Sequence, residues 1–313
     1  MRDTKKQIFT NSYILMALAL ISCFLWGSAF PSIKVGYRLL SIGAEDTYEK
    51  IVFAGYRFFL SSMMIFAFCL VTGRSLKLKK KSHLPKVFFL GILQTTIQYT
   101  FFYIGLSNTS GTLGSILSSS STFFTVILAH FFYKADKLTL RRVAGVILGF
   151  VGVVIANIKG NGVQGGFSIT GEGFVIISSL VGAVAGIYTK KISKDISPFA
   201  ISGYQLFIGS IILIFIGFVG GGREIVFTPK SFILLLYLGF ISAAAFTLWA
   251  ILLKYNGVGK VSIYKFTIPL FGTLLSFIFL QEKFMGFYVI TSAILVSLGI
   301  LLINATSKSK INK

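Results

Sequence analysis

The sequence predicts an all-α membrane protein in which ten transmembrane helices form two inverted five-helix repeats. The first observation is composition: 55% of the 313 residues are hydrophobic and 12% are charged. Soluble domains are about 25% charged, so a chain this poor in charge needs lipid as its main solvent. The second observation is a series of apolar runs long enough to cross a bilayer. The third is a motif that recurs in the second half of the chain.

The apolar runs give ten segments, since a helix needs roughly 20 residues to cross a bilayer. They are Ser12–Gly36, Tyr48–Val71, Lys86–Leu106, Thr109–Tyr133, Arg142–Ile158, Gly171–Thr189, Pro198–Gly220, Ser231–Leu253, Val258–Leu280 and Phe284–Asn304. The loops are short, so neighbouring helices should be antiparallel. The basic stretch before the first run resembles a signal peptide. That run is too long for one and nine more follow, so we expect it to stay as the first helix.

Orientation follows from the lysines and arginines in the loops, which favour the cytoplasmic side. With the N-terminus inside, 21 of the 30 basic residues fall on the inside, 6 on the outside and 3 within helices. We therefore expect a multi-pass protein of the cell (cytoplasmic) membrane with both termini in the cytoplasm.

The placement of the charged residues indicates which partners the protein has. A net charge of +21 could suggest nucleic acid, but the basic residues sit in short clusters between apolar runs, so we expect a lipid bilayer and no nucleic acid. All nine acids lie in loops, termini or helix ends. A proton-coupled pump usually needs a carboxylate inside the membrane, so this placement favours facilitated diffusion or exchange. Cys23 and Cys69 lie inside apolar runs, which predicts buried thiols and no disulfide.

A repeat divides the chain. The segment Phe53–Ser62 reads FAGYRFFLSS and Ile201–Ser210 reads ISGYQLFIGS. At one constant offset, the first set matches the second: Gly55, Tyr56, Phe59 and Ser62 against Gly203, Tyr204, Phe207 and Ser210. Both stretches begin the second helix of a five-helix half, and five is odd, so the halves should have opposite topology. We assign the repeats to residues 12–158 and 171–304, with a substrate site near the midplane where they meet.

The stretch Ser262–Glu282 gives the sharpest site candidate, Lys265. A lysine deep in a membrane helix costs roughly 2.5–3.5 kcal/mol, and Pro269 in the same helix leaves a backbone carbonyl to be satisfied elsewhere. Both residues suit a helix that faces a polar cavity, where Lys265 could hold a substrate carboxylate or phosphate. The other interpretation is that Lys265 extends to the nearby cytoplasmic interface.

Other polar and aromatic residues inside the apolar runs are candidates for the same cavity. Hydroxyls recur on one face of the fourth helix at Ser118, Ser121, Thr122 and Thr125, where they could contact substrate or serve close helix packing. Gln94 and Gln98 share a face of the third helix, and two amides in a membrane are costly unless paired or hydrated.

Aromatic residues complete the predicted substrate site. Trp26 and Trp249 could stack on an apolar or aromatic substrate, although Trp249 could equally belong to the interfacial belt. Tyr188 could donate a hydrogen bond or anchor at the interface. Arg57, near the outer end of the second helix, is interpreted as reaching the interface or pairing with Glu45, Asp46 or Glu49.

Several short motifs make the chain resemble a known family. The first half carries Trp26-Gly27-Ser28-Ala29-Phe30 with Lys34, then Arg57-Phe58, and then Gly145, Gly149 and Gly152. The second half carries Gly171-Glu172-Gly173, Gly186-Ile187-Tyr188-Thr189-Lys190-Lys191, and Pro269 followed by Leu280-Gln281-Glu282-Lys283. In order and spacing these are similar to EamA-type permeases of the drug/metabolite transporter superfamily.

The resemblance implies export or exchange of small metabolites, often amino acids or related compounds. It also implies a cavity lined mainly by helices 1, 3, 4, 6, 8 and 9. Two departures stand out: hydroxyl residues fill the fourth-helix positions where the family often has a proline, and Asp136 stands near the place of a family glutamate.

We therefore expect a secondary transporter that moves small amino-acid-like, amphiphilic or anionic solutes by alternating access. The rival within carriers is proton-coupled multidrug efflux. An intramembrane enzyme would need an acid pair, a metal set or a Ser–His dyad, and the chain has two histidines, His83 and His130, so we expect no enzyme, metal or cofactor. A scaffold or sensor would not explain the inverted repeat. The Gly-xxx-Gly pairs at Gly145 and Gly182 can pack helices within or between protomers, which leaves a homodimer open.

Overall fold

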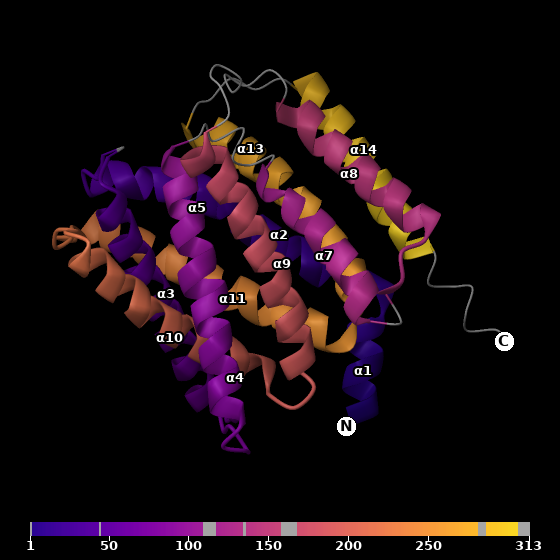
Figure 1. Ribbon diagram of the computed structural model, residues 1–313, viewed down its shortest axis with the longest axis horizontal. Helices are drawn as coiled ribbons and strands as arrows, with labels where there is room; N and C mark the ends of the chain where they lie inside the picture. The colour runs from indigo at the N-terminus through magenta and orange to yellow at the C-terminus, as the bar shows by residue number, and fades with distance from the viewer. Residues whose placement is uncertain are drawn as a thin grey trace.

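The computed structural model describes residues 2–43, 45–108, 117–133, 136–157, 168–280 and 286–305, and within these ranges it contains helices and no strands (Figure 1). The first half comprises α1 Arg2–Thr10, α2 Ser12–Leu39, α3 Thr47–Val71, α4 His83–Leu90, η1 Gly91–Ile97, α5 Gln98–Ser107, α7 Ser120–Phe132 and α8 Leu140–Asn157. The second half comprises η3 Ile169–Gly173, α9 Phe174–Ile192, α10 Pro198–Val219, α11 Pro229–Tyr255, α12 Val258–Ser262, η4 Ile263–Phe266, α13 Thr267–Leu280 and α14 Gly286–Ala305.

Seven helical spans in the described chain are long and apolar enough to cross a bilayer. They are Ser12–Leu39, Thr47–Val71, His83–Ser107, Ile169–Ile192, Pro198–Val219, Pro229–Tyr255 and Val258–Phe279. Large apolar side chains such as Val71 and Phe131 are exposed on the outside, while hydroxyl residues such as Ser61, Ser62 and Ser202 are fully buried. This inverted distribution fits lipid as the solvent, and the chain is a multi-pass membrane protein.

The predicted segments match the observed helices closely where the structure describes them. The predicted helix starts at Thr109 and Phe284, the predicted end at Ile158, and Glu282 lie outside the described residues. The sequence did not predict α1 as a separate helix. It packs on the end of α11, where the rings of Phe9 and Tyr255 stack at 5.2 Å and Asn256 Nδ2 donates to the Phe9 carbonyl at 2.9 Å.

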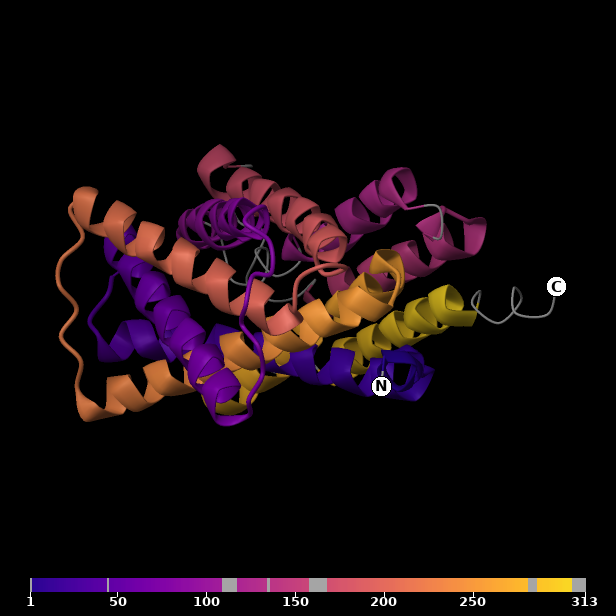
Figure 2. The same ribbon diagram turned by 90° about the horizontal axis from the view of Figure 1, so that it is seen from below.

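The helices form two groups with a pair on each side. Bundle A is α2, α11 and the segment α12–η4–α13; bundle B is α4–η1–α5, α7 and η3–α9. Figure 1 shows bundle B in front of bundle A, and Figure 2 shows the two bundles one above the other. The crossed pair α3 and α10 lies on one flank, and α8 and α14 lie side by side on the other. The space between the bundles holds the site.

Two irregular turns interrupt the helices that border this space. The run Gly91–Ile97 is a wide π-helical turn, in which Thr95 fills the position that a side chain on Gly209 of α10 would occupy. Isolated π turns are common at functional sites. The run Ile263–Phe266 is a tight 3₁₀ turn. Pro269 has no N–H to return to the Lys265 carbonyl, so the chain changes helix type there.

The predicted segment Val258–Leu280 matches the observed span Val258–Phe279, which runs through α12, η4 and α13 because of the proline. One prediction needs correction. Arg57 does not pair with the loop acids: its Nε donates to Ser242 Oγ at 2.9 Å. The acids bind another cation, Arg223, which lies 3.0 Å from Glu49 and 3.4 Å from Asp46.

Candidate functional site

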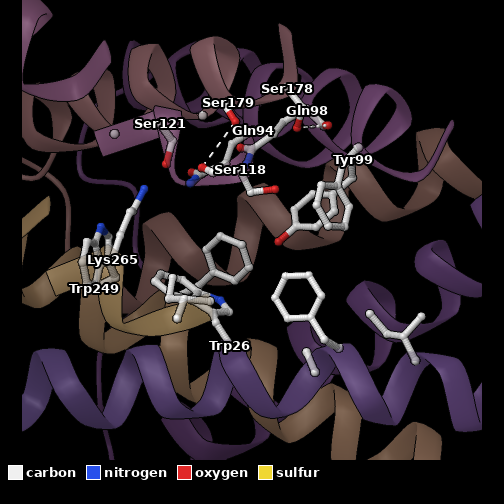
Figure 3. Close-up of a pocket in the computed structure, with 18 of the residues that line it drawn as sticks. Trp26, Gln94, Gln98, Tyr99, Ser118, Ser121, Ser178, Ser179, Trp249 and Lys265 are labelled. Atoms are coloured by element: carbon white, nitrogen blue, oxygen red, sulfur yellow. Dashed lines mark hydrogen bonds between the residues drawn. The ribbon is translucent and has the colours of Figure 1, made fainter. Parts of the chain in front are cut away.

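A cavity of about 160 Å³ lies between bundles A and B, within the apolar part of the helices (Figure 3). Bundle A gives it an aromatic wall and one lysine, and bundle B gives it a wall of amides and hydroxyls. A largely apolar concave site with a few converging polar groups is the usual form of a small-molecule site. The two walls differ in chemistry, so they would contact different faces of one ligand.

The aromatic wall is built on α2 and α11. Trp26 lies edge-on to Trp249, with ring centroids 5.1 Å apart, and to Phe246 at 5.5 Å. The Nε1 atom of Trp26 is buried and has no hydrogen-bond acceptor among the described residues. Trp249 is 5% exposed, which argues against the interfacial belt and places its ring in the cavity. Figure 3 shows both indoles below the polar wall.

Lys265 extends from η4 into this cavity. Its Nζ lies over the Trp249 ring, 5.4 Å from the ring centroid, and Figure 3 shows it directed toward Ser121 on the opposite wall. The backbone beneath is held by local bonds: Thr267 Oγ1 donates to the Tyr264 carbonyl at 2.7 Å, and Cys23 Sγ donates to the same carbonyl at 3.2 Å. The geometry favours the cavity over the interface as the position of this charge.

The polar wall comes from η1, α5, the start of α7, and α9. Ser178 Oγ donates to the Gln98 carbonyl at 2.9 Å, and Ser179 Oγ donates to the Ser118 carbonyl at 3.4 Å. These bonds join α9 to its two neighbours and leave the glutamine side chains facing the cavity. The Oε1 atoms of Gln94 and Gln98 are buried without a donor among the described residues. A buried polar atom without a partner is costly, so a ligand donor or water would be favoured there.

The structure brings together seven of the nine residues predicted for substrate binding. The cavity is lined by Trp26, Gln94, Gln98, Ser118, Ser121, Trp249 and Lys265. Thr122 is not among the lining residues: it is fully buried, and its Oγ1 donates to the Ser262 carbonyl at 3.3 Å. Tyr188 is not among them either, and its ring packs edge-on against Phe89 at 5.2 Å.

Some lining residues were not predicted from the sequence to bind substrate. Arg57 is 2% exposed and lines the cavity from α3. Its neutral partner, Ser242, lies 185 positions away, so nothing local reveals it. Ser178, Ser179, Gly182 and Gly186 line the cavity from α9. Their spacing on one helical face was a signal that the sequence did contain.

A second cavity of about 270 Å³ adjoins the first, since Phe30 and Ile33 line both. It lies toward the loop 40–46 and is also lined by Lys34, Lys50 and Tyr103. Glu45, Asp46 and Glu49 are within electrostatic range of Lys50. Both cavities have basic side chains in their lining: Arg57 and Lys265 in the first, Lys34 and Lys50 in the second.

The charged side chains that line the site are basic. Its described lining contains two cations, Lys265 and Arg57, and no carboxylate. No cluster of His, Cys, Asp or Glu suited to a metal ion occurs in the described ranges. His130 serves the structure, because its Nδ1 accepts the Leu138 N–H at 2.9 Å.

Comparison with known proteins identifies a family of transporters. A model described as the EamA-like transporter family matches residues 13–158 and 169–305. An uncharacterized transporter of Archaeoglobus fulgidus is 26% identical over 95% of this chain and 98% of its own length. The uncharacterized transporter YvbV of Bacillus subtilis is 28% identical over 96% and 94%. A solved crystal structure with 14% identity has the same fold, with a TM-score of 0.77 over 93% of this chain and 96% of the other.

Proposed function

The chain belongs to the EamA-like transporter family, and from that premise we propose that it is a secondary transporter of small organic anions or amphiphilic metabolites. Substrate binds in the cavity between bundles A and B. The bundles rock about it, so that the cavity opens to one side of the membrane and then to the other. The carrier exports or exchanges its substrate and performs no chemistry on it.

One observation carries this proposal: Lys265 is directed into a cavity inside the apolar part of the bundle. A charge there is expensive unless water or a counter-ion meets it, and among the described residues no carboxylate lines the cavity. A substrate carboxylate or phosphate would supply the counter-charge, and the ion pair gains strength as the local dielectric falls. The indoles and the amides then select the rest of the molecule.

Alternating access requires two related halves, and the packing supports ten membrane helices in two inverted repeats over 12–158 and 171–304. In the two repeats α2 corresponds to α9, α5 to α11, and α7 to α13. The contact of α2 with α11 therefore corresponds to that of α9 with α5, and the contact of α2 with α13 to that of α9 with α7. The pairs α3 with α10 and α8 with α14 map onto themselves. At the crossing of α3 and α10, the matched residues Phe59 and Phe207 meet each other, with centroids 5.9 Å apart.

The loop charges give this carrier its orientation. The loop at 72–82 carries five lysines and arginines, and Lys190, Lys191 and Lys194 cluster at the end of α9. The loop at 40–46 carries none, and the loop at 220–228 carries Arg223 alone. By the positive-inside rule, the clustered end faces the cytoplasm and both termini lie there. The relatives from a bacterium and an archaeon support the cytoplasmic membrane as the location.

Counterflow in proteoliposomes tests the function. Liposomes loaded with a mixed pool of unlabelled amino acids and small organic acids should take up trace labelled members of the pool. Lys265→Ala should selectively lose the anionic or zwitterionic solutes, and Lys230→Ala, an exposed lysine at the start of α11, should behave as wild type. Equal uptake by wild type and Lys265→Ala would remove Lys265 from the site. No uptake by folded protein would contradict the carrier.

The same liposomes separate facilitated exchange from proton-coupled efflux. We expect counterflow to proceed without a pH gradient, since no carboxylate lines the described part of the cavity. Accumulation that requires an imposed gradient, and collapses with a protonophore, would establish proton coupling instead.

A further inference from the structure

The proposed function leaves one buried charge unexplained. Arg57 lines the same cavity as Lys265, yet its hydrogen-bond partner is the neutral Ser242, at 2.9 Å. Its other neighbours are the face of Phe58, 5.2 Å from the guanidinium carbon, and the side chains of Tyr99 and Tyr103. No described carboxylate lies within ion-pair distance of it. A buried guanidinium without an anion is unfavourable, so this end of the cavity calls for a negative group.

Aromatic rings connect the two cations. Lys265 lies over Trp249, Trp249 contacts Trp26, and Trp26 contacts Phe246. The ring centroids of Phe246 and Phe58 lie 6.4 Å apart, and the Arg57 guanidinium lies over the Phe58 ring. In the order of these ring contacts, Lys265 comes at one end of the row and Arg57 at the other. Figure 3 shows the Lys265 end of that row separated from Tyr99, which packs on Phe58 at 4.5 Å between centroids.

Resting on the transporter function, we propose that the substrate is an organic dianion with two acidic groups joined by an apolar or unsaturated middle. One acidic group pairs with Lys265 and the other with Arg57, while the middle lies along the aromatic row. Gln94 and Gln98 on the opposite wall meet hydroxyl or amine substituents of the middle. Arg57 is then a second substrate-binding residue, supported from behind by Ser242.

Charge balance makes this class preferable to its neighbours. A zwitterion brings no net charge and leaves the two cations of the lining uncompensated. A monoanion leaves one of them uncompensated in a site of low dielectric, where the remaining charge is costly. A dianion neutralises both.

The chain carries its own reporter for this site. Its two tryptophans, Trp26 and Trp249, both line the cavity, so intrinsic fluorescence of the purified full-length protein reports occupancy directly. The probes are aliphatic acids, which do not absorb where indole does: the dicarboxylates from succinate to suberate, the monocarboxylates of equal length, and ω-amino acids such as 6-aminohexanoate. At the best-fitting length, the dicarboxylate should bind at least about tenfold more tightly than both matched probes.

Variants test whether Arg57 binds the second acidic group of the substrate. Arg57→Gln should reduce the dicarboxylate preference to about onefold while monocarboxylate binding persists, which also shows that the variant is folded. Arg57→Lys should retain most of the preference. Lys265→Gln is an independent variant at the other end and should remove the preference too. Lys230→Gln is the surface control.

Equal or tighter binding of the monocarboxylate or the ω-amino acid would overturn the inference. So would the absence of a fluorescence response to every dicarboxylate, or a preference that survives in both Arg57→Gln and Lys265→Gln. Counterflow separates this result from the function. Transport of other solutes without a dianion preference leaves the carrier standing and rejects the dianion. A dianion preference without counterflow rejects the carrier and keeps the site.

Discussion

At the scale of single residues, the site depends on small residues as much as on charged ones. Gly182 gives room to Gln98: a Cβ on Gly182 would lie 2.8 Å from the Gln98 amide nitrogen. Gly186, one turn further along α9, has nothing within 4 Å of the position its Cβ would take, and it lines the cavity. The first glycine gives room to a polar side chain, whereas the second leaves space open in the cavity.

This difference predicts a variant that blocks the site without harming the fold. Gly186→Leu should place its side chain in the cavity of about 160 Å³ and reduce counterflow to near the level of empty liposomes. The free energy of unfolding should be unchanged or up to about 1 kcal/mol higher, because glycine is unfavourable in a helix. Val184→Leu on the exposed side of α9 should transport normally. Full transport by Gly186→Leu would show that substrate passes elsewhere.

Residue by residue, the sequence predicted the polar candidates better than their partners. An amide, a lysine or a tryptophan inside an apolar run is visible without a structure, and seven of the nine predicted residues share the cavity. Thr122 was misleading because the same helical face that presents Ser118 and Ser121 to the cavity also meets the Ser262 carbonyl. The position of Arg57 depends on α11, which lies far along the chain. Its proximity in sequence to the loop acids therefore gave a wrong prediction of its partner.

At the scale of elements, the end of α11 and the start of α12 form a joint, a region where hydrogen bonds connect the two bundles. Lys190 Nζ of α9 donates to the Asn256 carbonyl at 2.7 Å and to the Lys254 carbonyl at 3.3 Å. Asp136, which follows α7, accepts the Val258 N–H at 2.8 Å and lies 3.6 Å from Arg142. Side chains of α9 and of the segment after α7 thus satisfy backbone groups that α11 leaves at its end and α12 at its start.

Removing Asp136 should loosen this joint. A hydrogen bond to a charged group contributes about 1.5–3 kcal/mol, so Asp136→Ala should speed amide hydrogen exchange across residues 256–262 by about tenfold or more. Asp195→Ala changes an exposed acid in the loop before α10 and should leave that exchange unchanged. Exchange at 256–262 that is identical in Asp136→Ala and wild type would mean that the two bundles are held together at this end by other contacts.

The sequence predicted the existence of the elements well and their internal geometry poorly. Apolar runs bounded by basic loops fix where a chain crosses a membrane, so helices such as α3 and α10 agree with prediction within a residue or two. The π turn of η1 depends on Thr95 fitting against Gly209, a contact that no local pattern encodes. The 3₁₀ turn of η4 could have been inferred from Pro269, but its exact bounds depend on Cys23 and Thr267 bonding to Tyr264.

At the scale of the whole molecule, the arrangement of contacts fits the proposed alternating access around one cavity. Bundles A and B meet across the cavity, and each flanking pair takes one helix from either half. The pair α8 and α14 packs closely, because a Cβ on Gly145 would lie 2.8 Å from the Gly299 carbonyl and one on Gly152 would lie 3.0 Å from the Ser292 carbonyl. Both contacts occur within one chain, so this glycine face is already used inside the protomer.

The position of a bound substrate tests the central claim most directly. We would determine the structure of the protein in lipid nanodiscs with its tightest-binding dicarboxylate. The account predicts density between the two bundles, with one carboxylate at Lys265, the other at Arg57, and the middle beside Trp26. Density in the outer cavity alone or on the lipid face, with the space between Lys265 and Arg57 empty, would contradict it.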